Sequence, residues 1–77
     1  MDHDREIDAL GLMCPLPVLK TRKTLQAMAP GAVLRVLADD PVAAVDIPHF
    51  CAEAGHELLK EEAAAGGGRL FYIRKRG

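Results

Sequence analysis

The chain has little aromatic content, almost no net charge and no long apolar run. It has 77 residues, with one tyrosine, two phenylalanines and no tryptophan, and its formal net charge is −1 at pH 7. Tight nucleic-acid binding relies on positive charge against phosphates and on aromatic rings against bases, so this composition argues against it. No apolar stretch approaches the roughly 18 residues of a membrane span, and the polar residues 1–6 do not resemble a signal peptide. We therefore expect a cytoplasmic protein with no membrane partner.

Cysteine is also scarce. Cys14 and Cys51 are the two cysteines, and no Cys-x-x-Cys pair is present, which disfavours thioredoxin-like dithiol chemistry. A structural disulfide is rare in the cytosol, and free cysteine prefers burial, so we expect Cys51 to pack in the core. A metal site of His49, Cys51 and His56 is disfavoured, because His49 and Cys51 lie two positions apart on a predicted helix and no further cysteine completes a zinc set.

The hydrophobic pattern predicts one small domain over residues 1–77 with the element order β-α-β-α-β-β. Strands are predicted at residues 5–10, 32–38, 56–62 and 69–74, and helices at residues 15–29 and 47–54. A strand–helix–strand unit makes its two strands parallel, whereas the last two strands, joined by an Ala/Gly loop, pair antiparallel. The predicted fold class is α/β: a two-layer α/β sandwich with a mixed four-stranded sheet and two helices on one face.

Each predicted helix has its own local signals. One face of the first helix is predicted to be buried, because apolar and small residues recur there at helical spacing: Val18, Thr21, Leu25, Met28 and Ala29. Asp40 before Pro41 and Asp46 before Ile47 resemble N-caps. We therefore expect a short turn at residues 41–45 and a second helix that begins at Ile47.

The most informative segment is Cys14-Pro15-Leu16-Pro17. Proline suits the first turn of a helix, so we expect Cys14 as the N-cap, with Pro15, Leu16 and Pro17 as the first three helical residues. Pro17 has no amide hydrogen, which leaves the Leu16 amide as the standard donor to the sulfur. The helix dipole and this amide predict a lowered pKa for the Cys14 thiol and hence a reactive thiolate. On the same reasoning, Pro17→Ala would restore an amide and lower that pKa further.

Four segments in order resemble the TusA (SirA-like) sulfur-carrier family: residues 8–17 with the Cys-Pro-x-Pro signature, 38–41, 46–51 and 72–75. The resemblance covers about residues 6–76. It implies the βαβαββ fold and a sulfurtransferase that carries sulfur as a persulfide on Cys14, with no other cofactor. It also implies a donor such as a cysteine desulfurase or rhodanese, and an acceptor protein in tRNA thiolation or another sulfur pathway. Met13 and Leu16 depart from one well-known branch, where a basic and often an acidic residue stand at these positions.

Six basic residues are candidates for binding a partner: Lys20, Arg22, Lys23, Arg74, Lys75 and Arg76. They suit acidic protein surfaces, with tRNA contacted at most indirectly, and we expect a monomer. A solvated helix face and a basic tail explain the same residues equally well.

Two functions from other classes compete with the carrier. One is a thiol redox sensor in which Cys14 is oxidised to sulfenic acid. The other is a non-catalytic interaction or RNA-binding module that uses the open face of the sheet. Replacing Cys14 by Ser separates these classes, because it removes sulfur transfer and redox response but spares a pure binding role.

Overall fold

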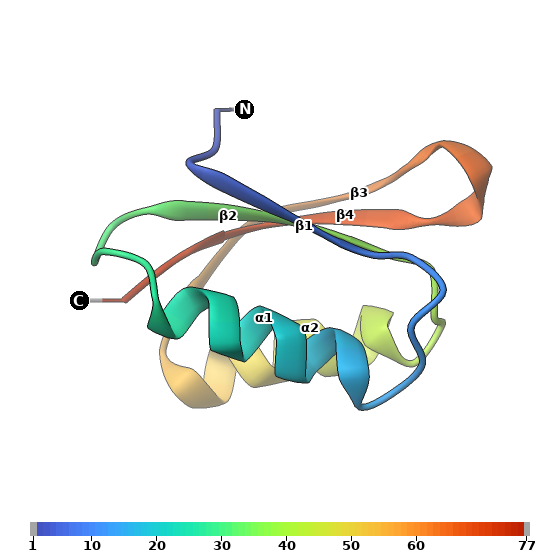
Figure 1. The fold of residues 1–77 in the computed structure, drawn as a ribbon, viewed down its shortest axis with the longest axis horizontal. Helices are drawn as coiled ribbons and strands as arrows, with labels where there is room; N and C mark the ends of the chain where they lie inside the picture. Colours follow the sequence, from blue (N-terminus) through green and yellow to red (C-terminus); the bar gives the residue numbers. More distant parts are fainter. Residues whose placement is uncertain (1, 77) are drawn as a thin grey trace.

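Four strands and two α-helices follow one another in the computed structural model, which describes residues 2–76 (Figure 1). The elements are β1 (Arg5–Ala9), α1 (Leu16–Gln26), β2 (Val33–Ala38), α2 (Ala43–Ala54), β3 (Glu57–Ala63), the short 3₁₀ turn η1 (Ala65–Gly67) and β4 (Arg69–Arg74). The four strands agree with the predicted ranges to within one residue at each end. Among residues 2–76, neither helix is long and apolar enough to cross a bilayer.

The strands form one mixed sheet in the order β1-β2-β4-β3. β1 runs parallel to β2, as a crossover through a helix requires, and β4 pairs antiparallel with both β2 and β3. Both helices lie on the same face of the sheet, and no other described element covers the opposite face (Figure 1). The predicted two-layer α/β sandwich is therefore confirmed.

The core lies between the sheet and the two helices. Ile7, Val36 and Phe71 stand side by side in the register of β1, β2 and β4, and all three are buried. Leu25 from α1 and Ile47 from α2 close this core from the other layer. Successive strand residues point to opposite faces, so burial alternates along β2.

The buried face predicted for the first helix is largely correct. Thr21 and Leu25 are buried and Val18 is half-buried. Because α1 ends at Gln26, three residues before the predicted end, the buried Met28 and the exposed Ala29 both lie beyond the helix. Thr21 is the polar member of this face, and its hydroxyl donates a hydrogen bond to a main-chain oxygen one turn earlier, at 2.8 Å.

Cys51 lies on the inner face of α2 and is 1% exposed, so its predicted place in the core is confirmed. Burial raises the pKa of the Cys51 thiol to about 11, because a thiolate loses its hydration there. This cysteine behaves as a small apolar residue.

The second helix begins earlier than predicted. α2 starts at Ala43, so the expected turn at residues 41–45 and the start at Ile47 are wrong. Asp40 supports the earlier start, because its Oδ1 accepts a hydrogen bond from Val42 N at 3.1 Å and its main-chain oxygen one from Ala43 N at 3.0 Å. Asp46 is therefore not an N-cap but a residue of the first turn of α2.

Candidate functional site

Cys14 lies in the loop between β1 and α1, and its side chain is exposed. Because β1 and β2 are parallel and in register, the loop after β1 lies beside the Asp39-Asp40 segment after β2. Asp39 Oδ1 accepts a hydrogen bond from Gly11 N at 2.9 Å, and Asp40 Oδ2 accepts one from Cys14 N at 2.6 Å. Two carboxylates from a distant part of the sequence thus hold the main chain of this loop at two positions, Gly11 and Cys14.

The start of α1 differs from the prediction. The N-cap is Pro15 rather than Cys14, so Leu16 is the first helical residue and Pro17 the second. The Leu16 amide donates to Met13 O at 2.8 Å, and it is therefore not the donor to the Cys14 sulfur. Because Cys14 is not the N-cap, residue 17 is not the N3 position of a cap on its sulfur, and we do not expect Pro17→Ala to lower the pKa of the thiol.

The Cys14 side chain instead contacts a carboxylate of the second helix. Its Sγ donates a hydrogen bond to Asp46 Oδ2 at 3.1 Å. This hydrogen bond, followed by partial loss of hydration and the negative charges of Asp46 and Asp40, raises the pKa of the Cys14 thiol above its ordinary value. The predicted lowering of this pKa is therefore wrong: the neighbours of Cys14 favour the thiol over the thiolate.

A shallow groove of about 250 Å³ adjoins this contact between α1 and α2. Its lining residues are Pro15, Val18, Asp46, His49, Phe50 and Glu53. The exposed side chains of His49 and Glu53 contact each other one helical turn apart. Within residues 2–76, no group of three His, Cys, Asp or Glu side chains is arranged to hold a metal ion.

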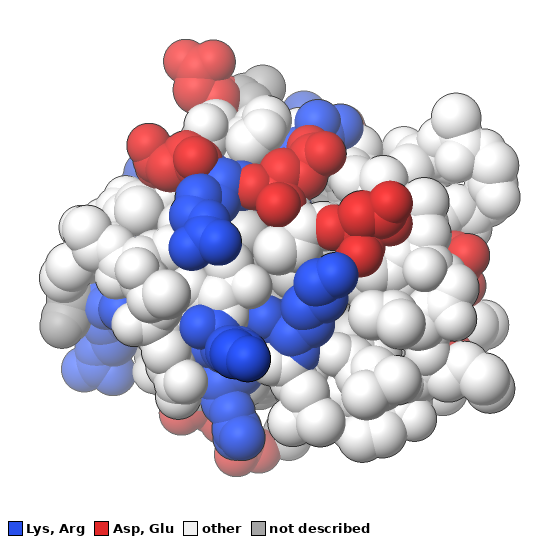
Figure 2. Space-filling view, in the orientation of Figure 1, with Lys and Arg blue, Asp and Glu red and all other residues white. Residues whose placement is uncertain are grey.

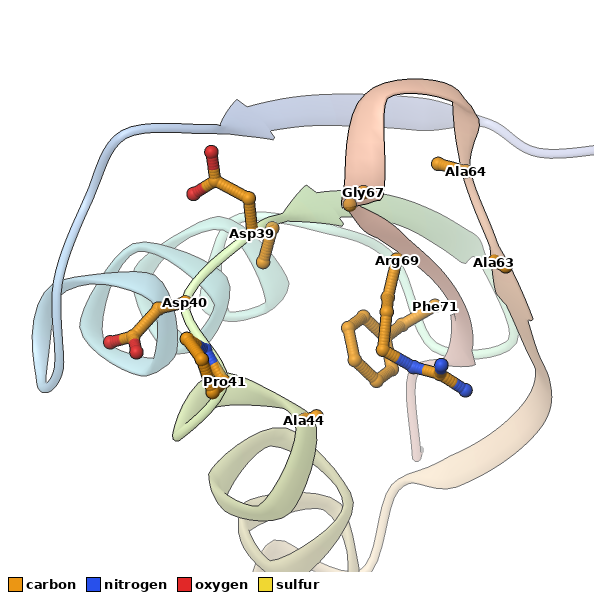
Figure 3. A pocket seen from close by; sticks show the side chains of 11 residues that line it. Asp39, Asp40, Pro41, Ala44, Ala63, Ala64, Gly67, Arg69 and Phe71 are labelled. Atoms are coloured by element: carbon orange, nitrogen blue, oxygen red, sulfur yellow. The ribbon is translucent and has the colours of Figure 1, made fainter.

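A second hollow, of about 320 Å³, lies between the β3–β4 hairpin and the start of α2 (Figure 3). Asp39 and Asp40 lie along one side of it and Arg69 along the other, with Phe71 and small Ala and Gly residues between them. The Arg69 guanidinium is already paired with Glu61 at 2.7 Å. This pocket adjoins the residues that anchor the Cys14 loop, but Cys14 is not part of its lining.

The six basic residues predicted to bind partners fall into two groups, one on α1 and one at the end of the chain. Lys20, Arg22 and Lys23 lie on α1, where Lys and Arg side chains gather on one face of the molecule, while acidic side chains gather over β1 (Figure 2). Lys20 donates a hydrogen bond to Asp8 O at 3.0 Å, which ties the start of α1 to the end of β1. Among the ion pairs of residues 2–76, none involves these three cations.

The three C-terminal basic residues have structural contacts of their own. Arg74 pairs with Glu57 across the strands at 2.9 Å. Lys75 Nζ donates to main-chain oxygens at the end of the first helical segment, the nearer at 2.6 Å, and Arg76 N donates to His56 Nδ1 at 3.0 Å. Burial, followed by the charges of Lys75 and Arg76, lowers the pKa of His56, which suits its role as an acceptor. Lys75 reaches the end of α1 and lines one pocket together with Arg22, so the two basic groups adjoin at that end of the helix.

Fold and site together define a small α/β protein that presents one accessible thiol before its first helix and keeps its second thiol in the core. The family model described as Sulfurtransferase TusA matches residues 5–75. The chain belongs to the TusA family, as its sequence motifs predict.

Named relatives agree with this assignment. The chain is 47% identical over 74 residues to a sulfur carrier protein TusA from Pseudomonas entomophila, with 96% of this chain and 91% of the relative covered. It is 44% identical over 75 residues to a sulfur carrier protein TusA from Allochromatium vinosum, with 97% and 96% covered. Among solved structures, a SirA-like protein from Desulfitobacterium hafniense matches with a TM-score of 0.85 and 25% identity, over 96% of this chain and all of that one.

Proposed function

We propose that this protein is a sulfur carrier whose Cys14 accepts a sulfane sulfur as a persulfide and passes it to an acceptor protein. The observation that carries the proposal is the exposed Cys14 thiol on a loop that is hydrogen-bonded at Gly11 and Cys14. A carrier must present one sulfur atom to two different proteins in turn. An exposed thiol on a fixed loop suits that task better than a thiol inside a pocket.

The chemistry is a thiol exchange in two balanced steps. In the first, Cys14 Sγ forms a bond to the outer sulfur of a donor persulfide, and the bond between the two donor sulfurs breaks. The donor leaves as a thiolate and recovers the proton that Cys14 has lost. In the second step an acceptor thiolate attacks the outer sulfur in the same way, and Cys14 returns to the free thiol. The scheme needs no cofactor, because the persulfide on Cys14 is a covalent intermediate.

Pro15, Leu16 and Pro17 support the sulfur site by shape rather than by donating to the sulfur. The prolines limit the backbone conformations of the segment, and the Leu16 amide closes a turn onto Met13 O. Leu16 is half-exposed and Met13 is 74% exposed, so both flank the thiol on the surface that a partner must approach. We propose that these two apolar side chains help to select the partner.

Lys20, Arg22 and Lys23 extend along α1 from the same end of the molecule and form our candidate docking surface for an acidic region of a partner. The donor is a cysteine desulfurase or rhodanese, and the acceptor is a downstream protein, with tRNA reached only through that acceptor. We propose a monomer in the cytoplasm, where a reduced thiol persists. Arg74, Lys75 and Arg76 form a second, adjoining group, in which Arg74 is already paired with Glu57 and Lys75 is held by main-chain oxygens.

The first experiment is intact-protein mass spectrometry after incubation with a cysteine desulfurase and cysteine. Wild type and Cys51→Ala should each gain one sulfur atom that dithiothreitol removes, and Cys14→Ser should gain none. A gain on Cys14→Ser, or no gain on wild type with desulfurase, rhodanese and polysulfide donors in turn, would contradict the proposal.

The redox-sensor alternative receives no specific support. A sensor of this kind commonly needs a second thiol to resolve the sulfenic acid. Cys51 is 1% exposed and sits on the core side of α2, so it is not presented to the Cys14 loop for that purpose.

A further inference from the structure

We propose that Asp46 controls the charge on Cys14: it keeps the empty carrier in the thiol form and disfavours the anion of the loaded persulfide, so that the sulfur passes readily to an acceptor. The first half of this inference concerns the free thiol alone. The second half rests on the proposed carrier function.

The contact that carries the inference is the hydrogen bond from Cys14 Sγ to Asp46 Oδ2 at 3.1 Å. An ionised carboxylate only accepts hydrogen bonds, so this bond exists when the sulfur holds its proton and is lost when the sulfur is a thiolate. Asp46 is held in the first turn of α2 and is half-buried. Its carboxylate therefore stays beside the sulfur instead of moving away with a flexible side chain.

Asp40 is the second carboxylate near the sulfur, and it acts in the same direction as Asp46. From the segment after β2, Asp40 holds the Cys14 amide at 2.6 Å and places a second carboxylate near the thiol. From α2, the groove beside Asp46 contains His49 and Glu53, which are paired with each other. From α1, the groove is lined by Pro15 and Val18, which carry no charge. Cys14 thus has an exposed thiol in acidic surroundings.

The same negative charges affect the stability of the loaded carrier. When a persulfide R–S–SH loads the empty carrier, Cys14–SH becomes Cys14–S–SH and the donor is released as R–SH, so atoms and protons balance. A persulfide is more acidic than a thiol and ionises near neutral pH. Its anion cannot donate to Asp46 and is repelled by it. Asp46 therefore stabilises the empty carrier and destabilises the loaded one, which favours release of the sulfur.

The thiol half is tested by following alkylation with iodoacetamide against pH for wild type, Asp46→Asn and the matched control Glu53→Gln. Both variants remove one negative charge from α2, but only the first neutralises the carboxylate that accepts the hydrogen bond from Cys14. Removing a charge about 4 Å away through water changes an equilibrium about fivefold. We expect Asp46→Asn to react about fivefold faster at pH 7, with its pH profile shifted to lower pH, and Glu53→Gln to match wild type.

An unchanged pH profile for Asp46→Asn, or an equal shift in Glu53→Gln, overturns this half. Asp46→Ala provides a second variant with good helix propensity, and it must shift in the same direction as Asp46→Asn. A structural disturbance alone would alter the rate without moving the midpoint of the profile.

The loaded half is tested by equilibrating each protein with glutathione persulfide and excess glutathione, and measuring the loaded fraction by mass spectrometry. Asp46→Asn should hold more sulfur than wild type, again by about fivefold in the equilibrium constant. An equal or smaller loaded fraction overturns this half. Failure of wild type to load from any donor would instead refute the carrier function, and the alkylation profile would still decide whether Asp46 controls the thiol.

Discussion

Replacing Asp40 by Ala should destabilise the protein more than any other single change in the loops around Cys14. Its carboxylate accepts from Cys14 N at 2.6 Å and from Val42 N at 3.1 Å. One side chain therefore anchors the Cys14 loop and supports the start of α2 at the same time. Asp39, its neighbour, makes a single comparable bond, to Gly11 N at 2.9 Å.

The magnitude follows from these two bonds. A hydrogen bond to a charged group contributes about 1.5–3 kcal/mol, and the lower end applies to the half-exposed Asp40. Loss of a bond at a helix start costs about 1 kcal/mol. We therefore expect Asp40→Ala to lower the free energy of unfolding by about 2–3 kcal/mol, and Asp39→Ala, with one bond lost, by about 1.5 kcal/mol.

Urea unfolding followed by circular dichroism measures both values under the same conditions, and amide hydrogen exchange adds a local readout. The Cys14 amide should exchange faster in Asp40→Ala than in wild type, because its acceptor is gone. Equal losses of stability for the Asp39 and Asp40 variants would refute the dual anchoring. Unchanged exchange at Cys14 would refute the loop contact in particular.

Two further predictions concern residues away from the thiol site. The pKa of Cys51 is raised to about 11 in the folded protein from an ordinary value of 9.0. The contribution of its neutral thiol to the free energy of unfolding is therefore complete below pH 9 and is lost as the pH rises toward 11. The urea midpoint of wild type should fall across this range by more than that of Cys51→Ala, and equal falls in both proteins would contradict this linkage. Lys75 donates to two main-chain oxygens, one at the last residue of α1 and the nearer one, at 2.6 Å, just after the helix. Lys75→Met should lower the free energy of unfolding in urea by about 1 kcal/mol, whereas the control Lys23→Met should change it by less than about 0.5 kcal/mol.

The order of elements could be predicted because each signal is local. Pro30 and Gly31 end the first helical segment, and the apolar run of β2 follows directly. The sequence predicts too late a start for α2 because Asp46 before Ile47 resembles an N-cap, whereas Pro48 lies inside the helix. Proline inside a helix removes one main-chain hydrogen bond, and here the packing of the helix offsets that loss.

A signal for the longer helix was present in the sequence. Ala43, Ile47 and Cys51 recur every four residues, and all three are buried on one face of α2. That spacing is typical of a helix that continues through Pro48. With the helix extended back to Ala43, Asp46 changes from a cap into a side chain available to the site.

The charge environment of Cys14 could not be predicted from its neighbours in the sequence. The residues next to Cys14 predict only a helix dipole and the amides of the first helical turn, and both of these favour a thiolate. The partners that reverse this preference, Asp40 and Asp46, come from positions 26 and 32 residues away. They reach Cys14 because a parallel β1–β2 pair brings the two loops to one edge of the sheet, and only the tertiary structure supplies that contact.

The two cysteines are protected from side reactions by different means, and the difference fits a carrier. Burial protects Cys51, both by excluding reagents and by raising the pKa of its thiol. Cys14 cannot be buried if it is to meet a donor and an acceptor, since each must bring its own sulfur into contact with Sγ. Neighbouring carboxylates lower its thiolate fraction instead, and this restrains oxidation and alkylation, which proceed through the thiolate. An aligned donor persulfide overcomes that restraint, because its leaving thiolate recovers the proton from Cys14. A variant that lacks Asp46 should accordingly lose more activity to hydrogen peroxide than wild type does, in proportion to its faster alkylation.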